Sequence, residues 1–110
     1  MNEVIKCLET RRSIRKYKQD QISEEDLLQI LEAGTYAATG RGKQSPKIIA
    51  VQDADTIKQL SKLNAAVMGT DSDPFYGAPT LIIVLAEKAV STAVEDGSLV
   101  IGNIMTAAHS

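Results

Sequence analysis

The feature that most limits how this chain can fold is an unbroken apolar run from Leu81 to Ala86. A strand with apolar side chains on both faces needs cover on both, and helices usually provide that cover. A second run, from Ile48 to Val51, is rich in β-branched residues and predicts another strand. The chain is therefore expected to place helices around a small sheet.

Segments with the apolar spacing of amphipathic helices surround these two runs. They are residues 2–10, 23–40, 54–63 and 94–108. The sequence after Ser23 resembles a capping box, which predicts a helix start, and Gly40 is expected to end that helix as a C-cap. The last helix is expected to be largely buried. Helices and strands together predict an α+β fold.

Composition favours a single domain spanning residues 1–110, because 44% of the residues are hydrophobic. The net charge of -2 argues against a surface built to hold nucleic acid or acidic lipid. No apolar run has the length of a membrane span, and no signal peptide is visible. The single cysteine, Cys7, is expected to pack as a small buried hydrophobe. We expect a cytoplasmic protein that binds neither nucleic acid nor a membrane.

The C-terminal end of the sequence predicts an incomplete fold. The last helical segment has neither a glycine stop nor a basic last turn. The two predicted strands would also leave exposed edges. We therefore expect the fold to be truncated at its C-terminus.

A basic segment from Arg11 to Tyr17 alternates polar with β-branched or aromatic residues and is expected to be extended. Alternate side chains of an extended segment share a face, so Arg11, Ser13 and Arg15 would project together, with Arg12 on the other side. Guanidinium groups clamp phosphate oxygens bidentately, and a serine hydroxyl adds one bond. The segment could thus hold a nucleotide phosphate, although spacing alone favours a solvated basic turn.

Several other kinds of site are not supported. The glycine-containing loop 40–46 follows a helix and lacks the spacing of a P-loop. One cysteine and one histidine cannot form a metal centre, and His109 is expected either to pack or to be exposed. Asp96 is expected to stabilise the start of the last helix, and Asn103 to satisfy a buried hydrogen bond.

The order of the motifs carries further information. An N-terminal helix is followed by Arg-Arg-Ser-Ile-Arg-Lys-Tyr at 11–17, and then by Ile-Ser-Glu-Glu-Asp-Leu at 22–27, leading into Ile-Leu-Glu-Ala-Gly at 30–34. Gln-Ser-Pro at 44–46, Asp-Pro-Phe-Tyr-Gly-Ala-Pro at 73–79 and Asp-Gly-Ser at 96–98 come next, and the last helix ends Ala-Ala-His at 107–109. This series resembles the opening of nitroreductases over essentially the whole chain. The resemblance favours the phosphate-binding interpretation of the basic segment.

The resemblance implies an FMN-dependent oxidoreductase that passes electrons from NAD(P)H to nitroaromatics, quinones or similar small aromatic acceptors. It also implies a homodimer with flavin sites at the subunit interface. The flavin would carry the hydride chemistry, so no catalytic side chain is expected. The implied cofactor-binding residues are Arg11, Arg12, Ser13 and Arg15 at the FMN phosphate and ribityl end, Ala38, Thr39, Gly40 and Gln44 near the flavin held mainly by the partner subunit, and Asn64 at the flavin ring.

The sequence also departs from the family's usual pattern. Many members have Pro-Ser near residues 38–39, asparagine near 42 and Gln-Pro-Trp near 44–46. This chain has Ala-Thr, glycine and Gln-Ser-Pro there, and these differences lie on the acceptor side of the flavin. The family's chain typically continues for roughly half as much again. Two alternatives remain: a truncated or non-catalytic flavin-binding remnant, and a small nucleic-acid-binding module using residues 11–18. The acidic balance and the absence of tryptophan oppose the second.

Overall fold

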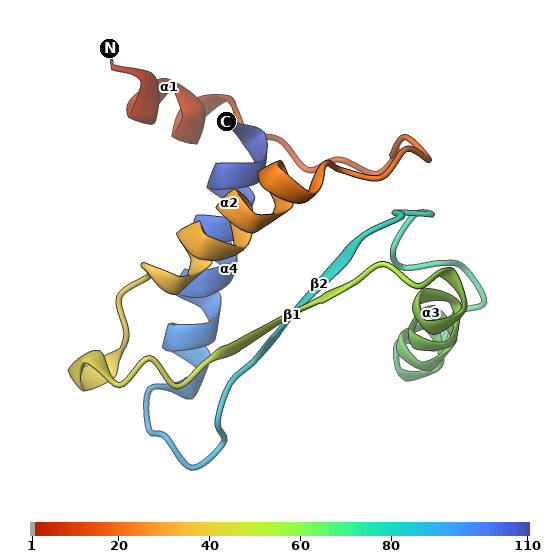
Figure 1. Cartoon of the computed structure of the whole chain (residues 1–110). Coiled ribbons are helices and arrows are strands. Elements are labelled where there is room, and N and C mark those ends of the chain that lie inside the picture. Colours follow the sequence, from red (N-terminus) through yellow and green to blue (C-terminus); the bar gives the residue numbers. More distant parts are fainter. Residues whose placement is uncertain (1) are drawn as a thin grey trace. The chain divides into compact units, whose positions relative to one another are not determined.

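A computed structural model describes residues 2–110 and confirms the α+β fold class (Figure 1). The elements in chain order are α1 (Glu3–Thr10), α2 (Glu24–Thr35), the 3-10 turn η1 (Gly40–Gly42), β1 (Lys47–Val51), α3 (Ala54–Met68), β2 (Leu81–Leu85) and α4 (Ala93–His109). The strands β1 and β2 pair in a two-stranded sheet and run in opposite directions. Both predicted strands and all four predicted helices are therefore present, with shifted ends.

The chain divides into two compact units by its internal contacts. Unit 1 contains the residues up to Arg12 together with Ser23–Ile49 and Val84–Ser110. Unit 2 contains Ser13–Ile22 and Ala50–Ile83. The division falls inside both strands, so each unit holds part of the sheet. That residues 1–110 form one domain stays a prediction.

Unit 1 is built on the packing of α2 against α4, which lie side by side in Figure 1. The helix α2 starts at Ser23, whose hydroxyl accepts the backbone N–H of Asp26 at 3.1 Å. Gly34 in α2 is buried, and a Cβ there would lie 2.9 Å from atoms of both Ile104 and Ile48. This missing side chain lets the two helices approach closely.

The helix α1 lies against the end of α4 in the same unit. The Cys7 thiol contacts the Thr106 carbonyl oxygen at 3.4 Å, and Thr10 forms a 2.9 Å hydrogen bond with the His109 ring. Cys7 is half-buried, which is less covered than expected, and His109 is exposed. The helix buries none of its residues, so its apolar face remains open in this structure.

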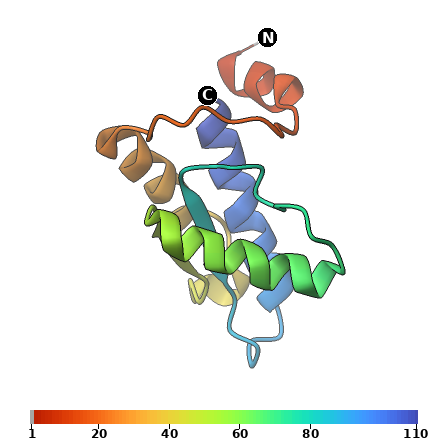
Figure 2. The same cartoon turned by 90° about the vertical axis from the view of Figure 1, so that its right-hand side faces the viewer.

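Unit 2 is organised by α3 and the loop that follows it, which turns back from the end of the helix toward β2 in Figure 2. Asp53 caps the start of α3 by accepting the Thr56 N–H at 3.0 Å. Gly69 ends the helix with a φ of 74°; its N–H donates to the Ala66 carbonyl at 3.2 Å, and the Thr70 N–H donates to the Ala65 carbonyl at 2.9 Å. That left-handed conformation favours glycine, which makes Gly69 the C-cap of the helix. The helix α3 therefore ends at Met68 and not at residue 63, where the apolar spacing predicted its end.

The expected end of the second helix is wrong. The helix α2 stops at Thr35, where the Tyr36 N–H donates to the Ala33 carbonyl and the Ala37 N–H donates to the Gly34 carbonyl. Gly40 is not a C-cap but opens the turn η1. Ala37 is buried although it lies outside the helix, whereas Ala38, which the apolar spacing placed within it, is exposed. Spacing alone could not separate a helical position from a buried loop position.

Burial is also lower than the sequence predicts. In α4 only Asp96, Gly97, Val100 and Ile104 are buried, whereas Val94 is 76% exposed. The side chains of β2 are half-buried along Leu81–Val84 and exposed at Leu85. The apolar content of these two elements predicts more cover than the described residues provide. The expected double cover of β2 is therefore not present in this structure.

Candidate functional site

The basic segment begins where α1 ends. Arg11 is the C-cap of α1, with extended backbone angles of -61° and 138°, and the residues that follow form no helix, in agreement with the prediction. Arg12 folds back, and its Nη1 donates to the carbonyl oxygens of Glu9 at 2.9 Å and Arg11 at 2.8 Å. These bonds satisfy carbonyls at the end of the helix. Arg12 therefore has a structural role in this chain.

The other three side chains of the motif behave differently. Arg11 is half-buried, and Ser13 and Arg15 are exposed. Within residues 2–110 none of these three side chains takes part in a hydrogen bond or an ion pair. Their donors are thus free to meet an anion, and guanidinium groups with a hydroxyl match the oxygens of a phosphate. Arg11 belongs to unit 1, whose first stretch ends at Arg12, and Ser13 and Arg15 belong to unit 2, which begins at Ser13.

The loop at residues 38–44 belongs wholly to unit 1 and is held from within. The Thr39 Oγ1 accepts the Gln44 N–H at 3.0 Å, which closes the loop. Arg41 and Gln44 have left-handed backbones, with φ of 56° and 51°. Such angles are costly for residues other than glycine and are found where the surroundings hold them in place. The backbone of this loop is therefore held in one conformation, as is typical of ligand-binding loops.

A buried carboxylate anchors this loop to the last helix. Asp96 is only 2% exposed, and its Oδ1 accepts the Gly40 N–H at 2.9 Å while its Oδ2 accepts the Thr92 hydroxyl at 2.9 Å. A Cβ at Gly40 would collide with the Thr92 side chain, so glycine is required by the close approach. The prediction that Asp96 stabilises the start of its own helix is incomplete, since its carboxylate reaches another segment.

The remaining predicted residues lie on helices. Asn64 is exposed on α3, and its Nδ2 donates to the Leu60 carbonyl at 3.0 Å within the same helix. Asn103 on α4 donates to the Ala33 carbonyl at 3.0 Å, so its predicted hydrogen bond is confirmed, although the side chain is exposed rather than buried. Unit 1 contains Ala38, Thr39, Gly40 and Gln44, which lie in one loop, and also Arg11 and Arg12 at the end of α1; unit 2 contains Ser13, Arg15 and Asn64.

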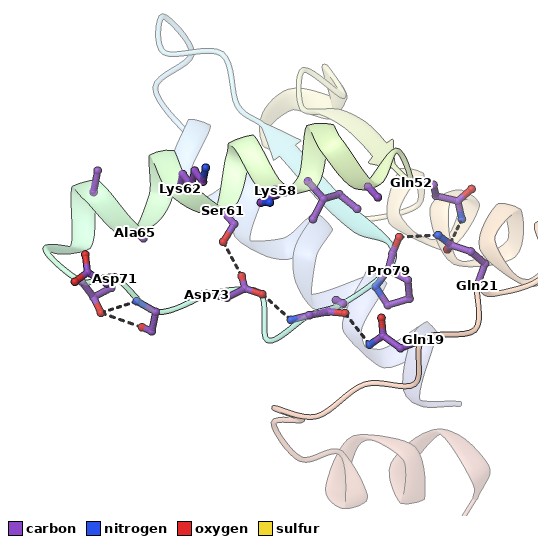
Figure 3. Close-up of a pocket in the computed structure, with 17 residues that line it drawn as sticks. Gln19, Gln21, Gln52, Lys58, Ser61, Lys62, Ala65, Asp71, Asp73 and Pro79 are labelled. Carbon is purple, nitrogen blue, oxygen red and sulfur yellow. Dashed lines mark hydrogen bonds between the residues drawn. The ribbon is translucent and has the colours of Figure 1, made fainter.

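Unit 2 contains a pocket of about 850 Å³ between α3 and the loop after it (Figure 3). Asp73 lines this pocket and connects the loop to α3. Its carboxylate accepts the Ser61 hydroxyl at 2.7 Å, the Phe75 N–H at 2.9 Å and the Gly77 N–H at 2.7 Å. The bond from Ser61, followed by that from Phe75, holds the pKa of the Asp73 carboxyl below its ordinary value. No role for Asp73 is predicted from the sequence, although Asp-Pro with Gly four residues after the Asp is a turn signal.

Unit 1 contains an apolar groove of about 580 Å³ beside the 38–44 loop. Thr39 and Gln44 contribute to its rim, and Gly34, Ile48 and Val100 contribute to its apolar wall. Across the described residues 2–110, no group of three or more His, Cys, Asp or Glu side chains could hold a metal ion. Among the same residues, no helix combines the length and apolar character needed to cross a membrane.

Comparison with known proteins gives a consistent result. The sequence model of the nitroreductase family matches residues 8–74. The FMN reductase (NAD(P)H) of Bacillus subtilis is 38% identical over 76 residues, which are 69% of this chain and 30% of that protein. The crystal structure of a nitroreductase with bound FMN from Bacteroides fragilis superposes with a TM-score of 0.89 at 31% identity, over 99% of this chain and 65% of that chain.

A second solved structure agrees. An FMN-dependent nitroreductase from Clostridium difficile gives a TM-score of 0.87 at 34% identity, over 97% of this chain and 55% of that chain. The present chain therefore spans between 30% and 65% of the length of these relatives.

Proposed function

Because this chain belongs to the nitroreductase family, we propose that it forms the FMN-binding part of an oxidoreductase that passes electrons from NAD(P)H to nitroaromatics, quinones or similar small acceptors. The family match over residues 8–74 carries this proposal, since it includes the basic segment, the 38–44 loop and Asn64. The names of the relatives add support, because they describe FMN reductase and FMN-dependent nitroreductase proteins.

The chemistry of the basic segment supports FMN as the cofactor. Arg11, Ser13 and Arg15 would hold the phosphate and the ribityl end, using donors that have no internal partner within residues 2–110. Each charge-assisted bond from a guanidinium to a phosphate oxygen is stronger than a bond between neutral groups. Arg12 would assist only indirectly, because its Nη1 already donates to the carbonyls that end α1.

The flavin ring would be approached by two other sets of residues. Ala38, Thr39, Gly40 and Gln44 would face the flavin held mainly by a partner subunit, and the bonds that fix this loop support such a role. Asn64 would offer its Oδ1 to the ring, since its Nδ2 donates within α3. When bound, FMN supplies the hydride chemistry. The side chains of this chain bind and orient the cofactor, and none is proposed as a nucleophile.

The proposal includes assembly as a homodimer in the cytoplasm. A site shared between two subunits requires two copies, and the exposed apolar side chains of α1 offer surface for such contact: Val4 is 64% exposed and Leu8 56%. A single cysteine is compatible with a reducing compartment.

The direct test is the absorption spectrum of the purified protein during titration with FMN, followed by NAD(P)H oxidation in the presence of a quinone. A flavin spectrum that shifts on binding, together with NAD(P)H consumption, is the expected result. A spectrum unchanged by FMN would contradict the proposal for this chain.

A second candidate function is flavin binding without sustained turnover. The departures from the family's usual pattern at residues 38–39, 42 and 45–46 favour it, because Arg11, Ser13 and Arg15 of the phosphate grip are kept while the acceptor side of the flavin is changed. In that case FMN would bind, but NAD(P)H consumption would stop after the bound flavin is reduced. Steady-state turnover over many equivalents of NAD(P)H would exclude this candidate.

A further inference from the structure

A pocket of about 900 Å³ in unit 1 has an unusual distribution of charge. One wall comes from the segment of residues 40–47 and the other from the turn of residues 87–92. Arg41, Lys43 and Lys47 line it, and Glu87 is the only acidic residue that does. We call this the basic pocket.

The cations of the basic pocket are not paired with an acidic side chain among the described residues. Within residues 2–110, Arg41, Lys43 and Lys47 form no hydrogen bond or ion pair through their side chains, and Glu87 pairs with none of them. Cations gathered along a concave surface raise the local concentration of anions. Arg41 offers a planar fork for two oxygens, and each lysine offers a point charge. The pocket is therefore suited to a small oxyanion.

The backbone of this segment is left-handed at three positions, and that conformation is costly at the two that are not glycine, Arg41 and Gln44. Arg41, Gly42 and Gln44 have φ of 56°, 64° and 51°. The bonds of Gly40 to Asp96 and of Gln44 to Thr39 keep the segment in place. Strain of this kind persists where the surrounding structure enforces it, and it is concentrated at binding sites.

One polar group of the pocket is also left without a partner. Ser45 lines the pocket, and its Oγ is buried with no hydrogen bond among the described residues. A buried hydroxyl without a partner is unfavourable. An anion bound against Ser45 would give this hydroxyl an acceptor.

The position of the pocket connects it to the proposed reaction. Gly40 and Gln44 line it, and both belong to the loop that would face the flavin. We infer that the basic pocket binds an oxyanion carried by a substrate of the oxidoreductase, either the 2′-phosphate of NADPH or the carboxylate of an acidic aromatic acceptor. This inference rests on the proposed function, and it assigns specificity-determining roles to Arg41, Lys43 and Lys47.

Binding without turnover is measured first, so that it does not depend on flavin. Calorimetric titration of the protein compares adenosine 2′,5′-bisphosphate with adenosine 5′-monophosphate, and 4-nitrobenzoate with 4-nitrobenzamide. In at least one pair the anionic ligand should bind more tightly, and Arg41→Gln, Lys43→Gln or Lys47→Gln should each weaken it by about ten-fold. Lys6→Gln on α1 removes the same charge from an exposed position outside the pocket and should change nothing.

Kinetics then identify the source of the anion. If the anion belongs to the electron donor, the same three variants lower kcat/KM for NADPH but not for NADH. If it belongs to the acceptor, they lower kcat/KM for 4-nitrobenzoate but not for 4-nitrobenzamide. Either result supports the inference.

The inference fails if neither pair is distinguished, or if Lys6→Gln weakens the anionic ligand as much as the pocket variants do. Failure of the unmodified protein to bind FMN would instead contradict the proposed function. The calorimetric comparison of phosphates and carboxylates would still report on the pocket.

Discussion

The carboxylate of Asp96 accepts the backbone N–H of Gly40 at 2.9 Å, across 56 positions of the sequence. The same carboxylate accepts the Thr92 hydroxyl, so both its oxygens are engaged in a site that is 2% exposed. This bond fixes the loop that carries Thr39 and Gln44. It therefore connects the stability of unit 1 to the residues proposed to face the flavin.

Replacing Asp96 by alanine should destabilise the protein by about 2–3 kcal/mol, because the Gly40 N–H and the Thr92 hydroxyl would lose a charged acceptor in a buried place. Asp96→Asn should cost less, because the amide oxygen can still accept the Gly40 N–H. Urea denaturation measures both effects. Glu95→Ala removes an exposed acid from the same helical turn and should stay within about 0.5 kcal/mol of the unmodified protein. Equal losses for Asp96→Ala and Glu95→Ala would contradict the anchoring role.

Two glycines in helices should respond oppositely to alanine. At Gly34 the new Cβ would lie 2.9 Å from Ile104 and Ile48, and this overpacking should cost about 1–3 kcal/mol, more than the gain in helix propensity. At Gly102 no atom lies within 4 Å of the new Cβ, so alanine should stabilise the protein by up to about 1 kcal/mol. Thermal unfolding of the two variants gives the comparison. A stabilised Gly34→Ala variant would show that α2 and α4 are not in close contact there.

The stability of unit 2 should fall in acid through Asp73. The pKa of this carboxyl is lowered in the folded protein by its bonds to Ser61 and Phe75. A lowered pKa gives stability that is fully present above the unfolded value of about 3.9 and is lost as pH falls through the folded value. Ser61→Ala removes the largest cause, so its stability should decline less steeply between pH 5 and pH 3. Identical acid profiles for Ser61→Ala and the unmodified protein would refute this origin.

Arg11→Ala and Arg15→Ala should each weaken FMN binding by about ten- to a hundred-fold and riboflavin binding far less, because each guanidinium is proposed to meet the phosphate. Fluorescence titration with the two flavins measures the difference. Arg12→Ala is the matched control, since its guanidinium donates to the carbonyls of Glu9 and Arg11. If the arginine variants lose FMN and riboflavin equally, the arginines support the fold rather than the phosphate.

Local signals in the sequence were sufficient to predict where elements begin and to identify the family. The start of α2 was predicted because the Ser23 hydroxyl and the Asp26 N–H are three residues apart, so the cap forms from neighbouring residues. The two apolar runs were confirmed as β1 and β2 for a similar reason, since strand propensity is contained in each run. The motif order identified the nitroreductase family, whose model matches residues 8–74.

What the sequence alone could not determine depends on groups far apart in the chain. The course of the 38–44 loop is coupled to Asp96 through Gly40, and no local pattern records that pairing. The basic pocket likewise forms only when residues 40–47 meet the turn of residues 87–92. A hydrogen bond or a cavity wall between distant segments costs chain entropy to form and is stabilised by packing elsewhere. Sequence therefore determined which elements form, and tertiary structure decided where they end and which side chains meet.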